Sequence, residues 1–527
     1  MPSRTLQKLG LLGAILLAEL LAITTWLDGA ALAGRTGMVG QIGASGAWVL
    51  RFVVGFAAAF AAFVALRGDF RVERAFPPVR FRSTWLLLHV VVAAAFALLS
   101  AQLYGAPTAI PDLLAAAWLV AGSVTLVVLC LAFYPLKIWT GLATESNAAL
   151  HAAGVAGAGV LAVRLSQSMW QSAALLTFQM VQVLVRPVLP DLLVQPEQMR
   201  LQGHSFGVII SEECSGLEGV GLVVAFGAVW LWLNRTEFRF PRALLLLPAG
   251  MLVIYALNAV RIALLLLLGD AGAPNVAAGG FHSQAGWICF NGVALGMTLV
   301  VPRMGWFSLH PRQAEQATYN PTAPYLMPFL AILASGMFTR AASADFDWLY
   351  AARLVAALAA LWWYREPLLK LDWRFGWAGV LAGAAVFAVW LGLDQWLALP
   401  AAAMPAALGS AGDGLRWAWI STRALAAITT VPIAEELVFR GYAMRRWSGA
   451  EFDALPLRSS TLAGVAGSSV VFGMLHGDRW IAGILAGFAF AWVARSRDRI
   501  GEAVAAHAVA NVLLAVWVLY FNQWQYW

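Results

Sequence analysis

Apolar segments of membrane-spanning length recur from one end of this 527-residue chain to the other, and they limit the folds it can adopt. A helix that crosses a bilayer needs roughly 20 mainly apolar residues, and by that criterion we count roughly fifteen segments. Charged residues make up 12% of the chain, against about 25% in a soluble domain. A transmembrane barrel would instead show short alternating segments. The sequence therefore predicts an all-α, polytopic integral membrane protein.

The net charge of +7 does not indicate a nucleic-acid partner, because the basic residues gather in short loops as the positive-inside rule expects. The lipid bilayer is the expected surrounding, and we expect no cofactor. The three cysteines are too few for a dense disulfide framework. Cys130 and Cys289 lie within apolar runs and are expected to be small core residues.

The distribution of basic residues predicts the orientation of the spans. Arg4 and Lys8 place the N-terminus in the cytoplasm, before an apolar run at 9–27 that resembles a signal peptide but is long enough for an uncleaved first span. Three further basic segments are predicted cytoplasmic loops: 67–82, 234–242 and 303–312. The three spans that these last two loops bound must alternate in direction: 216–233 runs inward to the first of them, 243–268 runs outward, and 286–301 returns inward to the second. The polar stretch 187–214 therefore faces outward.

A stretch that mixes proline, charged and polar residues interrupts the apolar runs near the middle of the chain. We interpret it as a linker at 306–322 between domains at 1–305 and 323–527. No sequence repeat relates the two halves. The sequence thus predicts two helical-bundle domains.

Three potentially reactive residues lie near the outer ends of consecutive predicted spans. Cys214 stands among acids in SEECSGLEG, just before one span. Arg261, in NAVRI, lies about two turns before the end of the next, and His282, in FHSQAGW, precedes the third. The alternation of the spans puts all three in the same outer layer of the membrane.

These residue types suit acyl transfer through a thioester. A thiolate is the nucleophile and is favoured by a nearby cation, which the acids beside Cys214 make necessary. Arginine stabilises a thiolate or an oxyanion, and histidine moves the proton. Taken singly, Arg261 could be a side chain that snorkels to the interface, and His282 an ordinary loop histidine. Their joint placement favours a site.

The order CSG before a span, N-x-x-R on the next and H before a third resembles the exosortases, multispan bacterial relatives of archaeosortases. The resemblance covers roughly residues 1–303. It implies a periplasm-facing site with Cys214 as nucleophile, Arg261 as stabiliser and His282 as acid/base. Implied substrates are exported proteins with a C-terminal sorting signal: a short Pro-containing motif, a transmembrane helix and a basic tail. The enzyme would cleave at the motif and transfer the new carboxyl end to a cell-envelope acceptor.

A second polar set lies within the apolar runs of the C-terminal half. It comprises EELVFRG from Glu435, FGMLHG ending after His476, and HAVAN from His507 to Asn511. On a helix, Glu436 and Arg440 share a face, as do His507 and Asn511. Intramembrane glutamates and histidines are candidates for function by default.

General-base hydrolysis is one interpretation of this set. Glu435 would activate water with help from His476, while His507 and Asn511 would donate hydrogen bonds to the oxyanion. Adjacent carboxylates disfavour joint ionisation, and Arg440 would keep Glu436 ionised. Glutamate and histidine are also metal ligands, but the HExxH pattern of zinc proteases is not present.

The patterns EExxxR, FxxxH and HxxxN, in this order, resemble the CPBP intramembrane proteases, the superfamily of CAAX endopeptidases. The resemblance covers about residues 326–527 and implies that Glu435, Glu436, Arg440, His476, His507 and Asn511 form the site. The two halves together resemble the exosortase E/protease fusion type of VPEID-CTERM sorting systems. That implies a multi-pass protein of the bacterial inner membrane. The basic residues nearby place Glu435 and His507 near the cytoplasmic side of the membrane. His476 comes late in a span that runs outward, which would carry it away from that side.

Two other functions fit parts of the pattern. A transporter could use Arg261, Glu435 and the histidines as a conduction path. Transporters often carry Gly/Pro-broken helices at matching places in two repeats, and we find no such pair. A binding scaffold with two inactive enzyme halves is the third interpretation.

Overall fold

The computed structural model describes residues 35–527 apart from 67–81, 106–109, 146–147, 212–213, 312–319, 398–399 and 450, together with isolated positions before residue 35. Its contacts divide the chain into two compact units, Met1–Ser168 and Met169–Trp527. Most of the predicted first span, most of the basic loop 67–82, and Glu212 and Glu213 lie outside the described residues.

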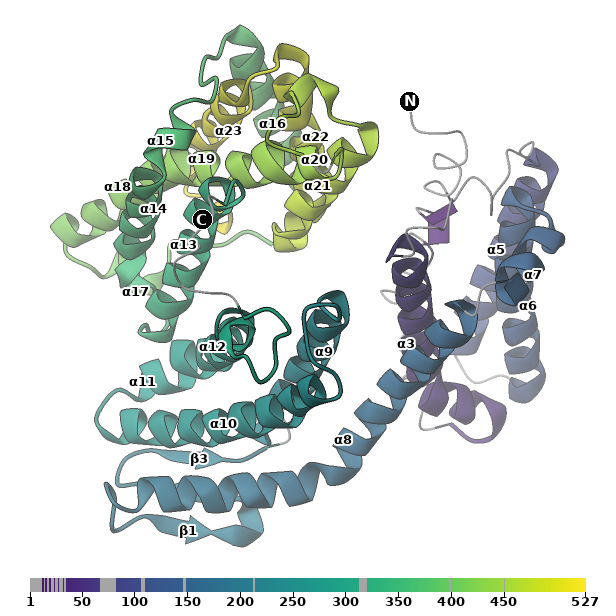
Figure 1. The fold of residues 1–527 in the computed structure, drawn as a ribbon, viewed down its shortest axis with the longest axis horizontal. Coiled ribbons are helices and arrows are strands. Elements are labelled where there is room, and N and C mark those ends of the chain that lie inside the picture. The colour runs from purple at the N-terminus through teal and green to yellow at the C-terminus, as the bar shows by residue number, and fades with distance from the viewer. Residues whose placement is uncertain are drawn as a thin grey trace. The chain divides into compact units, whose positions relative to one another are not determined.

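The first unit is a set of apolar helices around a helical hairpin. Its helices are α3 (Gly37–Leu66), α5 (Ser83–Tyr104), α6 (Pro111–Phe133), α7 (Leu136–Glu145) and the beginning of α8 (Ala148–Val185) (Figure 1). Helices α5 and α6 pack along their length. The Trp118 indole donates a hydrogen bond to the Ser100 hydroxyl (2.8 Å), and buried His89 lies 2.7 Å from the Glu19 carboxylate. Ser100, Trp118 and His89, which lie within this apolar hairpin, thus each have a polar partner.

The second unit begins with the rest of α8 and a small sheet, followed by three long helices. The strands are β1 (Leu193–Gln195), β2 (Arg200–Gln202) and β3 (Gly207–Ile209), joined through η1 (Pro196–Gln198). The helices and helical turns are α9 (Leu217–Leu233), η3 (Arg242–Leu245), α10 (Leu246–Asp270), α11 (Pro274–Val276), the π-helical turn η4 (Ala277–Phe281), α12 (His282–Val300) and η5 (Val301–Arg303).

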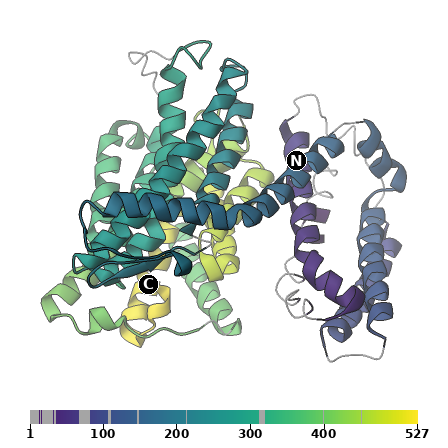
Figure 2. The same ribbon diagram turned by 90° about the horizontal axis from the view of Figure 1, so that it is seen from below.

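The sheet is antiparallel, with the order β1-β2-β3, and folds within the polar stretch that was predicted to face outward. In two views it lies along the second half of α8 (Figures 1 and 2). Buried side chains join it to the helices: Phe178 from α8, Leu201 from β2, and Ile262 and Leu266 from α10 belong to one apolar cluster. Burial of such side chains contributes about 1.5–3 kcal/mol each. The cluster thus holds the chain that leads into Cys214 against two helices.

The rest of the second unit is a helical bundle (Figure 1). Its longer elements are α13 (Ala323–Ala341), α14 (Ala351–Trp363), α16 (Trp377–Trp396), α18 (Asp413–Ile428), α19 (Thr430–Glu436), the π-helical segment η7 (Leu437–Ala443), α21 (Leu462–Met474), α22 (Trp480–Arg497) and α23 (Ile500–Phe521). Short turns connect them: η6 (Trp348–Tyr350), α15 (Arg365–Leu368), α17 (Ala406–Gly409), α20 (Met444–Arg446), η8 (Leu457–Ser459), η9 (Gly477–Arg479) and η10 (Trp524–Tyr526). The core gathers Phe439, Phe472 and Phe490 with small alanines of α22 and α23.

The predicted fold class is confirmed: the chain is a helical, polytopic membrane protein. In the described part of the chain, seven helices are long and apolar enough to cross a membrane, and shorter apolar helices accompany them. The division at linker 306–322 stays a prediction, and residues 312–319 lie outside the described positions. Two elements before that linker, η4 and α12, contact α13, which follows it, and all three belong to the second unit.

Candidate active sites

Cys214 lies in a tight turn between β3 and α9. Its N–H donates to the Ser211 carbonyl oxygen at 3.1 Å, and Gly216 caps α9 with a φ of 90°. That φ is in the left-handed region, which favours glycine. A Cβ on Gly216 would also lie only 2.9 Å from Nδ2 of Asn258. Glycine therefore lets the cysteine turn approach α10 closely.

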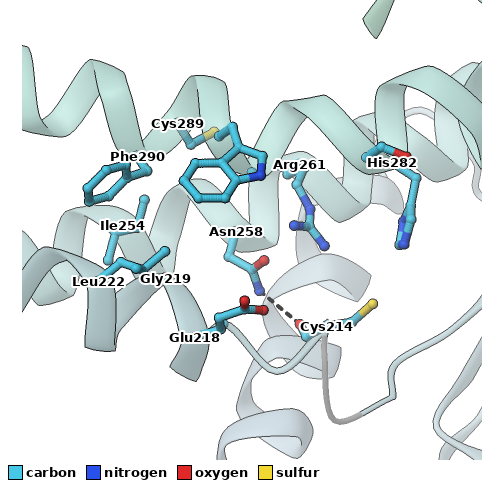
Figure 3. A pocket seen from close by; sticks show the side chains of 14 residues that line it. Cys214, Glu218, Gly219, Leu222, Ile254, Asn258, Arg261, His282, Cys289 and Phe290 are labelled. Carbon is cyan, nitrogen blue, oxygen red and sulfur yellow. Dashed lines mark hydrogen bonds between the residues drawn. The ribbon is translucent and has the colours of Figure 1, made fainter. Parts of the chain in front are cut away.

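Side chains from α8 and α10 hold this turn on both sides. Nδ2 of Asn258 donates to the Cys214 carbonyl oxygen at 2.9 Å (Figure 3). The Thr177 hydroxyl lies 3.0 Å from the buried Ser215 carbonyl oxygen and 2.9 Å from the Tyr255 hydroxyl. Tyr255 in turn donates to the Ala173 carbonyl oxygen at 2.6 Å. These contacts position the backbone that carries the thiol.

Arg261 and His282 approach Cys214 from the two neighbouring helices. Arg261 lies one turn after Asn258 on α10, and His282 begins α12 directly after the π-helical turn η4. Figure 3 shows both side chains pointing toward the side on which Cys214 lies. The absence of a side chain at Gly286 makes room for the guanidinium, because a Cβ there would lie 3.0 Å from Nη1 of Arg261.

The Arg261 charge has no protein counter-ion in the described structure. Its Nε is buried and makes no hydrogen bond there, and no carboxylate of the described residues forms an ion pair with it. A buried donor without a partner is costly, about 1–3 kcal/mol, and such a group calls for a ligand or another function. Arg261 also lines the cavity that Cys214 lines.

Cys214, Arg261 and His282 together line two cavities. The first, about 270 Å³, is also lined by Glu218, Asn258, Cys289, Trp287 and Phe290. The second, about 230 Å³, is mainly apolar and is otherwise lined by Phe206, Val208, Ile209, Ile262, Leu265 and Ala278. The predicted outer-layer residues thus meet where the two cavities adjoin.

The second site centres on a buried ion pair. Glu436 and Arg440 are both fully buried, with Nε of Arg440 3.2 Å from Oε2 of Glu436 and Nη1 donating to Oε1 at 3.2 Å. Nη2 of Arg440 donates to the Gly487 carbonyl oxygen at 2.8 Å. His507 Nδ1 lies 2.9 Å from Oε1 of Glu436. The pair that helical spacing predicts is therefore formed, across the π-helical segment η7.

Glu435, His476 and Asn511 lie around this pair with looser connections. Oε2 of Glu435 is 3.9 Å from Nε2 of His507, and the Glu435 side chain is 18% exposed where Glu436 is 0%. Among the described residues, the hydrogen bonds and ion pairs of the two carboxylates involve His507 and Arg440 and not His476. His476 Nδ1 bonds the Phe472 carbonyl oxygen at 2.8 Å, and the Phe472 ring packs against the rings of both His476 and His507. Nδ2 of Asn511 donates to the Ala427 carbonyl oxygen at 2.7 Å, which leaves one N–H for another acceptor.

Aromatic rings enclose the ion pair. The Arg440 guanidinium lies 4.5 Å from the Phe472 ring centroid, and the Phe490 ring stacks on His507 at 4.9 Å. Such rings exclude water and strengthen the electrostatic contacts that they surround. No group of three or more His, Cys, Asp or Glu side chains is arranged to hold a metal ion in the part of the chain that the structure covers.

Sequence reasoning missed the residues that support each site. Asn258 was visible within N-x-x-R, one turn before Arg261, but its hydrogen bond to the cysteine turn was not foreseen. Thr177 and Tyr255 carry no local signal, because their partners are far away in the chain. Phe472 and Phe490 look like any other core aromatic residues until their contacts with His507 are known.

Two family models match the chain at separate places. Residues 54–299 match the transmembrane exosortase model, and residues 417–513 match the type II CAAX prenyl endopeptidase Rce1-like model. The first range contains Cys214, Arg261 and His282, and the second contains every candidate residue of the second site. Comparison with curated proteins and with solved structures found no match.

Both families consist of membrane-embedded proteases or transpeptidases, so the fold and the matches support a membrane-embedded enzyme. More particularly, the two matches in one chain support an exosortase fused to a CPBP-type protease.

Proposed function

We propose that the first site is a cysteine transpeptidase that cleaves the C-terminal sorting signals of exported proteins. The observation that carries the proposal is the convergence of Cys214, Arg261 and His282, from three separate elements, on the same two cavities. The buried, unpaired Nε of Arg261 adds to it. The exosortase match supplies the class of substrate.

In the proposed reaction, His282 accepts the thiol proton of Cys214, and the thiolate attacks the carbonyl carbon of the scissile peptide bond. Arg261 stabilises the thiolate and then the oxyanion of the tetrahedral intermediate. The carbon–nitrogen bond breaks, His282 returns the proton to the leaving amine, and an acyl thioester remains on Cys214. A nucleophile of the envelope acceptor then attacks the thioester and displaces the thiolate.

The proposed setting is the bacterial inner membrane, with this site on the periplasmic side. The loops at 234–242 and 303–312 are basic, which favours the cytoplasm for them and the outside for the chain between α10 and α12. Substrates would then arrive after export, with their transmembrane helix in the bilayer.

Mass spectrometry of a substrate that carries a C-terminal sorting signal tests this function. We expect wild-type enzyme to cleave it and to carry a substrate thioester on Cys214, and Cys214→Ala to do neither. Cys289→Ala is the matched control, because Cys289 is the other cysteine that lines the first cavity. Cleavage by Cys214→Ala, or loss of cleavage in Cys289→Ala alone, would overturn the assignment of the nucleophile.

For the second site we propose glutamate-dependent peptide hydrolysis, with the membrane anchor left by the first reaction as substrate. The arrangement of Glu435, Glu436, Arg440 and His507 supports it. Glu435 is the more exposed carboxylate and would activate water, assisted by His476. His507 and the free N–H of Asn511 would stabilise the oxyanion. Glu436 and Arg440 would hold His507 in place.

Glu435→Gln and Glu436→Gln form a matched pair for this proposal. Glu435→Gln should abolish trimming of the anchor without lowering thermal stability in detergent, because Glu435 makes only a 3.9 Å contact. Glu436→Gln should lower stability by about 3–5 kcal/mol, because it leaves the buried Arg440 charge without its partner. Processing products that are unchanged in Glu435→Gln would refute the proposed base.

A further inference from the structure

Strand β3 is the free edge of the small sheet. The strand order β1-β2-β3 leaves one side of β3 without a neighbouring strand among the described residues. Its register pairs Val208 with Leu201. The pairs two positions away on either side are hydrogen-bonded: the Ile210 N–H donates to the Met199 carbonyl oxygen at 2.9 Å, and the Gly203 N–H donates to the Phe206 carbonyl oxygen at 2.8 Å. This alternation makes Val208 a hydrogen-bonded residue of the β2–β3 ladder.

The backbone groups of Gly207 and Ile209 therefore point away from β2, toward the open edge. No hydrogen bond of these groups to another described residue is present. Gly207 and Ile209 lie on either side of Val208, two residues apart. This is the spacing of donors and acceptors that an added strand needs. Unpaired edge strands are templates for pairing with another chain.

The open edge borders the cavity that contains the reactive residues. Val208 and Ile209 line the second cavity from the strand side, and Ala278 and His282 line it from η4 and α12. Ile262 and Leu265 of α10, beside Arg261, complete the lining. Strand β3 also leads within a few residues into Cys214, so a peptide along this edge would pass the thiol.

The edge is held in place before any peptide binds. In the turn that precedes β3, the Asp270 carboxylate at the end of α10 accepts a hydrogen bond from the Ser205 N–H at 2.7 Å and lies 3.1 Å from Nδ1 of His204. Phe206 packs against Gly269, where a Cβ would lie 2.3 Å from its ring. The strand is thus fixed to the helix that carries Arg261, which lowers the ordering cost of binding.

We propose that the extended segment on the N-terminal side of the scissile bond binds as a fourth strand on the β3 edge, through the backbone groups of Gly207 and Ile209. This inference rests on the proposed transpeptidase function. The N-terminal side is the one assigned, because the C-terminal side enters a transmembrane helix whose backbone groups are already paired. A proline fits only where its missing N–H would face away from β3. The bound strand holds the acyl portion beside Cys214 after the amine leaves.

A scan of synthetic substrate peptides with one N-methylated residue at a time tests this binding mode on the full-length enzyme. An N-methyl group removes one donor and leaves the side chain intact. We expect kcat/KM to fall about tenfold at alternate positions, and to change little at the positions between them. A loss without this two-residue period would overturn the strand model.

Ile209→Pro tests the same edge from the enzyme side. It removes an outward N–H at an edge position, where proline is tolerated. We expect KM to rise about tenfold, while alkylation of Cys214 by a small thiol reagent proceeds at the wild-type rate. Val194→Pro is the control, because the register places its N–H at the opposite edge of the sheet, and it should keep the wild-type KM. An unchanged KM in Ile209→Pro would count against the proposal.

Failure of the transpeptidase function is distinguished by the unmodified peptide. If wild type and Cys214→Ala process that peptide alike, the transpeptidase function itself fails.

Discussion

Arg261 is the residue whose surroundings most clearly indicate a functional role. The acids of SEECSGLEG raised the question of what cation offsets them, and Arg261 lines both cavities with the thiol. Its Nε is buried without a hydrogen bond among the described residues, and Gly286 leaves space for it. Arg440, by contrast, is paired with the Glu436 carboxylate and donates to the Gly487 carbonyl oxygen, whereas Arg261 forms no ion pair with a described carboxylate.

We therefore expect Arg261→Ala to lower kcat for thioester formation by about 100- to 1000-fold, the usual effect of removing one oxyanion donor. Arg261→Lys should recover only part of the rate, because a point charge does not replace the planar fork of donors. Single-turnover thioester formation measures the effect, and Arg235→Ala, at an exposed position just after α9, is the control. A wild-type rate in Arg261→Ala would show that the guanidinium does not act on the reaction.

At the scale of elements, both sites depend on interruptions of regular helix. The cysteine turn requires the left-handed Gly216 before α9, and π-helical turns lead into His282 and carry Arg440. Such π-helical turns occur often at functional sites, because they rotate one side chain relative to the rest of the helix. Hydropathy alone does not reveal these interruptions, because it reports how apolar a segment is and not the geometry of its backbone.

Gly216→Ala and Gly221→Ala compare the turn with the helix that follows it. Alanine at 216 meets Asn258 and adopts a strained φ, so we expect a stability loss of about 1–2 kcal/mol and a lower kcat for thioester formation. Alanine at 221 meets no atom within 4 Å and should be neutral or stabilising by up to about 1 kcal/mol. Thermal unfolding in detergent and single-turnover kinetics measure both. Equal behaviour of the two variants would contradict the positioning role of the turn.

At the scale of the whole molecule, the alternation of spans predicts the side of the membrane on which Cys214 reacts. In a Cys130→Ala, Cys289→Ala background, a membrane-impermeant thiol reagent should label Cys214 in intact spheroplasts. A cysteine placed at exposed Arg235, in the predicted cytoplasmic loop, should be labelled only after permeabilisation. Labelling in the reverse order would place the first site on the cytoplasmic side.

Much of the membrane architecture could be predicted, because the hydropathy and charge of a segment are properties of its own residues and do not depend on tertiary contacts. Counting crossings predicted that Cys214, Arg261 and His282 lie in one layer, and in the structure the three residues line the same two cavities. The side of the membrane stays a prediction. The pairing of Glu436 with Arg440 followed from helical spacing. The sheet at 193–209 was not predicted, because its strands are short and its register depends on packing against α8 and α10.

The sequence by itself determined the class of protein, its two candidate sites and the types of residue in them. Only the tertiary structure decided that Thr177, Tyr255 and Asn258 hold the cysteine turn, that Glu436 is buried while Glu435 is partly exposed, and that a free strand edge leads to the thiol. The physical reason is that apolar runs specify which segments enter the bilayer. Which helices then become neighbours depends on the close fit of side chains distant in sequence.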